Sequence, residues 1–159
     1  MRWSEFEAAA PDLAAIGRDR FTARNVVVLA TLRADGSPRI SAVNPFFVSG
    51  ELLIGSMRSA KVTDLLRDPR CALHSAIFDG DGSEGEFKLI ARVVPVVDPT
   101  LRDADRTAWW TNYPPDKAHV FAVDVLSAVY VKWDWGAGTY ETISWAERGE
   151  VKSETHSYP

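Results

Sequence analysis

The part of this sequence best suited to chemistry is a short run of hydroxyl and cationic side chains, Gly55-Ser56-Met57-Arg58-Ser59-Ala60-Lys61. The run follows a predicted strand at 51–55 and opens a predicted helix at 59–67. The first N–H groups of a helix have no partner within the helix and lie at the positive end of its dipole. Two serines and two cations add further donors, so the run suits a phosphate monoester. In the alternative interpretation, Ser59 only caps the helix and both cations are solvated.

Short apolar segments at close spacing predict the sheet that must position this run. The predicted strands cover 26–32, 39–48, 51–55, 71–78, 87–97, 119–134 and 139–145. Asp35-Gly36 predicts a hairpin turn, and Leu126-Ser127 marks a bend in the longest strand. Further helices are expected at the N-terminus, where Ser4 and Glu7 fit a capping box, and over 98–110.

These elements predict an α+β, mainly β, fold in which strands close or nearly close into a barrel. The length of 159 residues fits one domain, 1–159. Its N-terminal helix would occupy 1–22, and 147–159 would form a polar tail.

The charge and the cysteine and histidine content limit the partners, compartment and metal sites that can be expected. The net charge of -4 argues against a nucleic-acid or anionic-membrane partner. The segment 33–70 nevertheless carries six cations against four acids, which favours a small anion as ligand. The single cysteine and the lack of a signal-like apolar segment favour the cytoplasm. The three histidines are widely spaced, so no metal site is expected.

An ordered set of short motifs runs through the first two thirds of the chain. Its members are Arg39-Ile40-Ser41-Ala42-Val43-Asn44, Ile54-Gly55-Ser56, Ser59-Ala60-Lys61 and Asp68-Pro69-Arg70. Over roughly residues 22–97 this set resembles the pyridoxamine 5'-phosphate oxidase-like, FMN-binding split-barrel family. The resemblance implies a six-stranded split β-barrel with flanking helices. It also implies a homodimer with a flavin, FMN, in a groove between the subunits.

The resemblance also implies a set of cofactor-binding residues. The strand 39–44 would run beside the isoalloxazine ring, and its first arginine would reach the phosphate. The strand end at 54–56 and the lysine of the run would complete the phosphate site, while a lysine on a later strand would approach the ring from the other subunit. The full predicted set is Arg39, Ile40, Ser41, Ala42, Val43, Asn44, Ile54, Gly55, Ser56, Met57, Arg58, Ser59, Lys61 and Lys88. No catalytic side chain is assigned, because the cofactor supplies the reactivity.

The predicted function is a flavin-dependent oxidoreductase that transfers hydride to a small organic acceptor. The sequence departs from true pyridoxamine phosphate oxidases at Ala60, where they have an arginine, and at 131–135, where their C-terminal substrate motif is missing. Both departures argue against vitamin B6 oxidation. One alternative is a reductase that uses the deazaflavin coenzyme F420 on the same fold. Another is a non-catalytic flavin or haem carrier, with His74 or His119 as the haem ligand.

Two adjacent tryptophans, Trp109 and Trp110, could serve either in ligand binding or in packing. A tryptophan can stack on a flavin ring or line a substrate pocket. Packing in the core or at a dimer interface is the competing interpretation for each of them.

Overall fold

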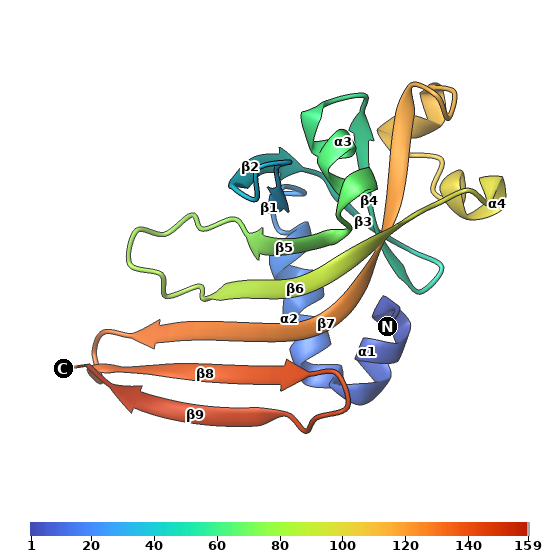
Figure 1. Cartoon of the computed structure of the whole chain (residues 1–159). Helices are drawn as coiled ribbons and strands as arrows, with labels where there is room; N and C mark the ends of the chain where they lie inside the picture. Colours follow the sequence, from blue (N-terminus) through green and yellow to red (C-terminus); the bar gives the residue numbers. More distant parts are fainter. Residues whose placement is uncertain (159) are drawn as a thin grey trace.

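The structure is a computed structural model, and it describes residues 1–158. An antiparallel sheet forms most of the molecule, with a few helices beside it (Figure 1). The helices are α1 Trp3–Ala9, α2 Pro11–Thr22, α3 Ala60–Arg67, α4 Pro99–Arg102 and the 3-10 helix η1 Trp109–Asn112. The strands are β1 Val27–Leu32, β2 Pro38–Val43, β3 Pro45–Val48, β4 Glu51–Met57, β5 Arg70–Ser75, β6 Glu86–Pro95, β7 Ala118–Asp134, β8 Thr139–Ala146 and β9 Lys152–Ser157.

The strands pair in the order β2-β1-β5-β6-β7-β4-β3, and β8 and β9 continue from β7. The sheet curls but does not close, which agrees with the predicted mainly β split barrel. It has nine strands within residues 1–158 rather than the six expected. The predicted strand 39–48 divides at Asn44 into β2 and β3, and β8 and β9 extend the sheet beyond the barrel.

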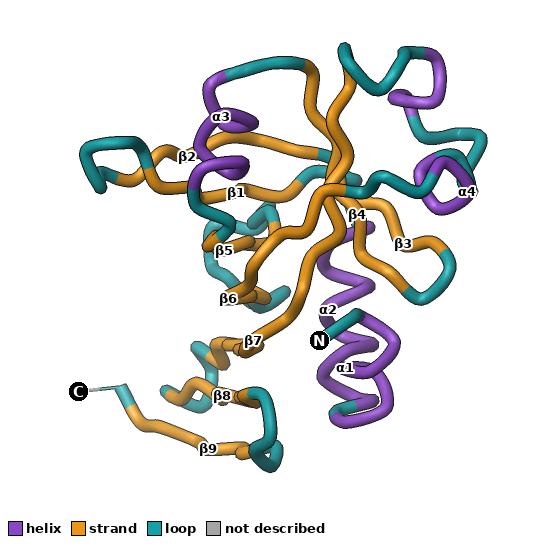
Figure 2. The backbone as a smooth tube through the Cα atoms, turned by 45° about the vertical axis from the view of Figure 1, so that its right-hand side comes forward, coloured by secondary structure: helices purple, strands orange, loops and turns teal. Residues whose placement is uncertain are grey.

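β7 joins the two parts of this sheet (Figures 1 and 2). Its first residues pair with β4, and its later residues pair with β8. The register against β6 shifts between Ile90 and Ala91, opposite Leu126. An extra residue on one strand bends it and increases its twist. The bend predicted at Leu126-Ser127 is therefore confirmed.

The N-terminal helices cover the core beside β6 and β7 (Figure 2). Trp3, Phe6, Leu13 and Phe21 are fully or almost fully buried, and a side chain of this size contributes about 1.5–3 kcal/mol on burial. α1 begins at Trp3, one residue before the predicted cap Ser4. Pro11 occupies the first turn of α2, as predicted.

The connections differ most from the sequence prediction. The helix expected over 98–110 ends at Arg102, because Asp105 accepts bonds from the Thr107 backbone and hydroxyl and forms a turn instead. The expected polar tail contains β9, which pairs with β8. The turn at Asp35-Gly36 is confirmed, with Gly36 at a φ of 82°. None of the helices within residues 1–158 combines the length and apolar character that a membrane span requires.

Candidate cofactor-binding groove

A groove of about 370 Å³ lies where β2 and β4 end and α3 begins. Eight of its nine lining residues belong to the set predicted from sequence, and the ninth is Trp109. The lining residues are Ala42, Val43, Asn44, Gly55, Ser56, Met57, Ser59, Lys61 and Trp109. The fold thus brings together the strand expected beside a flavin ring and the turn expected to bind a phosphate.

The turn between β4 and α3 presents free donors to this groove. Ser59 is the N-cap of α3, yet its hydroxyl makes no capping bond to the helix within the described residues. The Ser59 Oγ instead lies 3.1 Å from the Ser56 Oγ, which donates to the Met57 carbonyl at 2.9 Å. The first N–H groups of α3 therefore stay open to an anion.

The charge of the groove is positive. Lys61 lines it half-buried, and the neighbouring Arg58 is exposed. Of the described residues that line the groove, none is acidic. Two hydroxyls, an ammonium group and helix N–H groups form a donor set that fits a phosphate.

Trp109 reaches the groove because Trp110 fixes the segment that carries it. Trp110 is fully buried, its Nε1 donates to the Arg102 carbonyl at 2.8 Å, and the Arg102 Nη2 donates to the Trp110 carbonyl at 3.0 Å. Gly55 permits this packing, since a Cβ there would overlap the Trp110 ring and lie 3.1 Å from the Trp109 ring. The two tryptophans therefore differ in their surroundings: Trp110 packs in the core, whereas Trp109 lines the groove.

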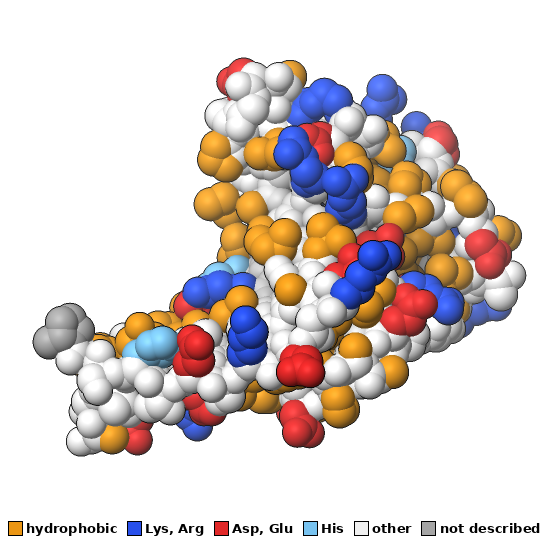
Figure 3. Space-filling model, turned by 60° about the horizontal axis from the view of Figure 1, so that its bottom comes forward, with side chains coloured by type: hydrophobic (Ala, Val, Ile, Leu, Met, Phe, Trp, Pro, Cys, Tyr) orange, Lys and Arg blue, Asp and Glu red, His pale blue; other side chains and the backbone are white. Residues whose placement is uncertain are grey.

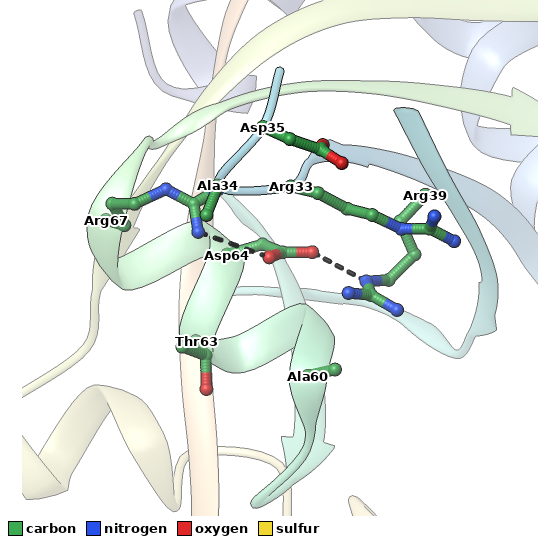
Figure 4. Close-up of a pocket in the computed structure, with 8 residues that line it drawn as sticks. All are labelled: Arg33, Ala34, Asp35, Arg39, Ala60, Thr63, Asp64 and Arg67. Carbon is green, nitrogen blue, oxygen red and sulfur yellow. Dashed lines mark hydrogen bonds and ion pairs between the residues drawn. The ribbon is translucent and has the colours of Figure 1, made fainter. Parts of the chain in front are cut away.

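Six residues of the predicted set lie outside the groove lining. Ile40 is 73% exposed on β2, Ser41 follows it, Ile54 is buried in the core and Arg58 is exposed on the turn. Lys88 lies on β6, where it forms an ion pair with Glu86. Arg39 lines a neighbouring hollow, where its Nε donates to the Asp64 Oδ2 at 2.6 Å (Figure 4).

Asp64 explains the placement of Arg39. This carboxylate is buried on α3 and also accepts a bond from the Thr31 hydroxyl at 3.1 Å. The bond from Arg39 lowers the pKa of Asp64 below its usual value, against the effect of burial, and the Thr31 bond adds to the lowering. Sequence reasoning missed this pairing, because Arg39 and Asp64 lie 25 residues apart and no local motif links them.

The candidate haem ligand His74 is engaged by the protein. Its Nε2 lies 2.8 Å from a Glu86 carboxylate oxygen, and its Nδ1 lies 2.6 Å from the Ser75 carbonyl oxygen. Both ring nitrogens therefore have protein partners. His119 lies on β7 opposite Ser56, at the strand pair that ends beside the groove.

The sequence profile of pyridoxamine 5'-phosphate oxidase matches residues 17–125. The chain belongs to this family. The matched region of this pyridoxamine 5'-phosphate oxidase family member includes every residue of the predicted cofactor-binding set. It leaves out α1, the first half of α2, the end of β7, and β8 and β9. No curated protein matches the sequence.

Solved structures share the fold of this family member at low sequence identity. A pyridoxamine 5'-phosphate oxidase-related, FMN-binding protein from Nostoc punctiforme has a TM-score of 0.63 at 11% identity, covering 94% of this chain and 96% of that one. A NimC/NimA family protein from Clostridium acetobutylicum has a TM-score of 0.61 at 15% identity, with 96% and 98% covered. A haem-binding protein from Mycobacterium smegmatis has a TM-score of 0.60 at 19% identity; the match covers 89% of this chain and 57% of that one. These similarities show the fold alone.

Proposed function

We propose that this protein is a flavin-dependent oxidoreductase that binds FMN in the groove and transfers hydride to a small organic acceptor. The observation that carries the proposal is the convergence of β2, β4 and α3 on one groove whose hydroxyl and cationic donors fit a phosphate. Family membership and an FMN-binding structural relative support it.

The residues of the groove have distinct roles in this proposal. The Ser56 and Ser59 hydroxyls, the Lys61 ammonium and the α3 N–H groups hold the phosphate. The end of β2 and the following Asn44, residues 42–44, would flank the ring with their backbone, and Trp109, which lines the groove, would shield the bound ring from water. The bound flavin would supply hydride transfer, so the protein binds, orients and shields rather than reacts.

We further propose that the protein acts as a homodimer in the cytoplasm. A row of apolar side chains crosses the outer face of the sheet, with Ile40 opposite Ala30, Ala30 opposite Ala72 and Ala72 opposite Ile90. Ile40 is 73% exposed and Ile90 is 54% exposed. A second copy of this chain would remove both from water.

The rival cofactors are coenzyme F420 and haem. F420 carries a phosphate that the same donors would hold. A haem carrier has a specific observation in its favour, the haem-binding structural relative, but both nitrogens of His74 are engaged. His119 is the remaining candidate ligand for that function.

The test is a titration of the protein with FMN, F420 and haemin, followed by tryptophan fluorescence and by absorbance. We expect FMN to bind most tightly. Lys61→Ala should weaken FMN binding by about 1.5–3 kcal/mol, or 10- to 150-fold, the scale of a charged hydrogen bond. The matched control, Lys152→Ala on the exposed edge strand β9, should leave the Kd unchanged.

Each other outcome has a clear meaning. A preference for F420 would make the protein a deazaflavin-dependent reductase. Haem binding that is lost in His119→Ala would make it a haem carrier. Tight FMN binding without oxidation of the reduced flavin by any acceptor would leave a flavin carrier, and an unchanged Kd in Lys61→Ala would remove Lys61 from the site.

A further inference from the structure

A second cavity, of about 290 Å³, lies between the end of α3, the β6–α4 connection and the first residues of β7 (Figure 1). We call it the proline pocket, because three of its eleven lining residues are prolines. It is lined by Leu66, Pro95, Val96, Val97, Pro99, Arg102, Pro115, Ala118, His119, Val120 and Phe121. Of the described residues, none lines both this pocket and the groove or the hollow that contains Arg39. It is therefore separate from the residues proposed to hold the cofactor.

Restrained backbone forms the walls of the proline pocket. Pro95 has a fixed φ angle and no N–H to donate, and the next residue, Val96, donates its N–H to the Val120 carbonyl at 2.9 Å. The turn that leads into β7 forms another wall, where the Ala118 N–H donates to the Pro114 carbonyl at 3.1 Å. Because these walls are already ordered, a ligand would lose little of its binding energy to ordering the protein.

The lining of the proline pocket is apolar apart from two basic side chains. Nine of the eleven lining residues are apolar, the other two are Arg102 and His119, and none of these described residues is acidic. Leu66 is 56% exposed and Val97 is 89% exposed, so part of the apolar lining remains in contact with water. A ligand with a hydrocarbon body would cover this surface, which is favourable.

Arg102 has one donor that the protein leaves unused. The residue is buried, its Nη1 donates to the Asp103 Oδ1 at 2.6 Å, and its Nη2 donates to the Trp110 and Tyr113 carbonyls. The Nε is also buried, and it has no hydrogen-bond partner among residues 1–158. Buried donors without an acceptor are rare and costly. An oxygen atom of a ligand would supply the acceptor that the protein does not.

His119 provides the second polar group of the proline pocket. It lies half-buried on β7, and within residues 1–158 its ring makes no hydrogen bond to another side chain or to the backbone. An imidazole carries at least one N–H donor whether it is neutral or charged. Two donors in an otherwise apolar cavity match a carboxylate, whose two oxygens accept from separate groups.

We propose that the proline pocket binds a small apolar carboxylic acid. The hydrocarbon body of this ligand contacts the prolines and Leu66, and its carboxylate accepts hydrogen bonds from Arg102 and His119. Pockets for small molecules begin at about 300 Å³, so the cavity of about 290 Å³ limits the ligand to a single ring or a short branched chain. The proposal goes beyond the proposed function and does not require a cofactor in the groove.

Isothermal titration with benzoate tests the proposal directly, because benzoate combines one apolar ring with one carboxylate. The unmodified protein should bind benzoate. Benzyl alcohol has the ring without the charge, and acetate has the charge without the ring. Each should therefore bind at least about tenfold more weakly than benzoate.

Two variants and a matched control locate the binding site. Leu66→Glu places a carboxylate beside the pocket and should abolish benzoate binding, whereas Val151→Glu, at another exposed apolar residue before β9, should leave the Kd unchanged. Both changes are at exposed positions, so thermal unfolding should show that both variants remain folded. His119→Phe keeps the ring and removes the donor, and it should weaken benzoate binding about tenfold, the loss of one hydrogen bond.

The outcomes separate this proposal from the proposed function. Absence of benzoate binding, equal affinity for benzyl alcohol, or an unchanged Kd in folded Leu66→Glu or in His119→Phe would overturn the carboxylate site. Lys61→Ala should lose FMN affinity and keep benzoate affinity, and competition between benzoate and FMN would contradict the placement in the proline pocket. Failure of FMN to bind, with benzoate binding retained, would overturn only the proposed function.

Discussion

Asp64 connects more parts of the site than any other single residue described above. It lies on α3 and accepts bonds from Thr31 on β1 and Arg39 on β2, while Arg67 approaches its second oxygen. A buried carboxylate without such partners would be unstable. The position of α3, and with it the turn proposed to bind a phosphate, therefore depends on this one charge.

Asp64→Asn tests this dependence through pH. The pKa of Asp64 is lowered from its usual 3.8 by the Arg39 bond, so the charged form stabilises the fold above that value. This stabilisation is lost as the pH falls through the lower pKa of the folded state. We expect Asp64→Asn to lower the free energy of unfolding by about 1–3 kcal/mol at pH 7, with a smaller difference at pH 3.

Urea unfolding at both pH values measures this difference. Asp116→Asn, an exposed acid whose side chain is 71% accessible, is the control and should stay within about 0.5 kcal/mol of the unmodified protein. A difference for Asp64→Asn that is the same at pH 3 and pH 7 would show that the charge of Asp64 does not stabilise the fold.

The residues that the fold brings together as expected are near neighbours in the chain. Ser56, Ser59 and Lys61 share one strand-to-helix turn, so their convergence was visible in the sequence. Arg39 and Trp109 depend on distant partners: the first is bound by Asp64, and the second is placed by Trp110 packing over Gly55. Such contacts are set by the tertiary fold and leave no periodic signal.

At the scale of elements, the segment between β6 and β7 carries the groove wall. Arg102 is buried and donates to the Trp110 and Tyr113 carbonyls, at 3.0 Å and 2.6 Å. These bonds hold η1 against β4, where Gly55 leaves room for two indole rings. This side of the groove is therefore formed by a segment without regular strand structure, and the hydrogen bonds of Arg102 hold that segment in place.

Gly55→Ala should disturb this wall. The new Cβ would overlap the Trp110 ring, so we expect a loss of about 1–3 kcal/mol of stability from overpacking and an altered tryptophan near-ultraviolet circular dichroism spectrum. Gly80→Ala is the matched control, because no heavy atom of residues 1–158 lies within 4 Å of a Cβ at that position. Equal stability of the two variants would show that η1 moves to accommodate the new Cβ with no loss in the free energy of unfolding.

Secondary-structure elements, like residues, were predicted where a local sequence signal specifies them and missed where a distant strand does. The α3 helix, the Asp35-Gly36 hairpin and the bend in β7 each have a nearby sequence signal and were predicted. The division of 38–48 into β2 and β3 was missed, because the two halves pair with different strands, β1 and β4. The composition of Lys152–Ser157 is polar, so β9 became recognisable only beside β8.

For the whole molecule, the distribution of surface side chains is the basis for the proposed association of two copies. Figure 3 shows hydrophobic side chains gathered on a hollowed face, with cationic side chains beside them. Ile40 and Ile90 are exposed at the two ends of the apolar row across β2, β1, β5 and β6. Full burial of a side chain of this size contributes about 1.5–3 kcal/mol.

Ile40→Lys combined with Ile90→Lys should therefore shift the protein from dimer to monomer in sedimentation velocity, because each change places a charge in the proposed interface. Val97→Lys replaces an apolar residue that is 89% exposed elsewhere and should leave the dimer intact. Identical sedimentation of the double variant and the unmodified protein would place the dimer interface on another face.

The break at Asn44 has a consequence for motion. β2 and β3 stand at opposite ends of the pairing order, yet they follow each other in the chain. These two edges of the sheet are thus joined through the covalent backbone at this point, and the groove lies across the junction, touching residues 42–44 and the end of β4. A bound ligand contacts both edges, so its binding energy opposes their separation. Amide hydrogen exchange in β2 and β3 should accordingly slow on cofactor binding, while exchange in the distant β8–β9 ladder stays the same.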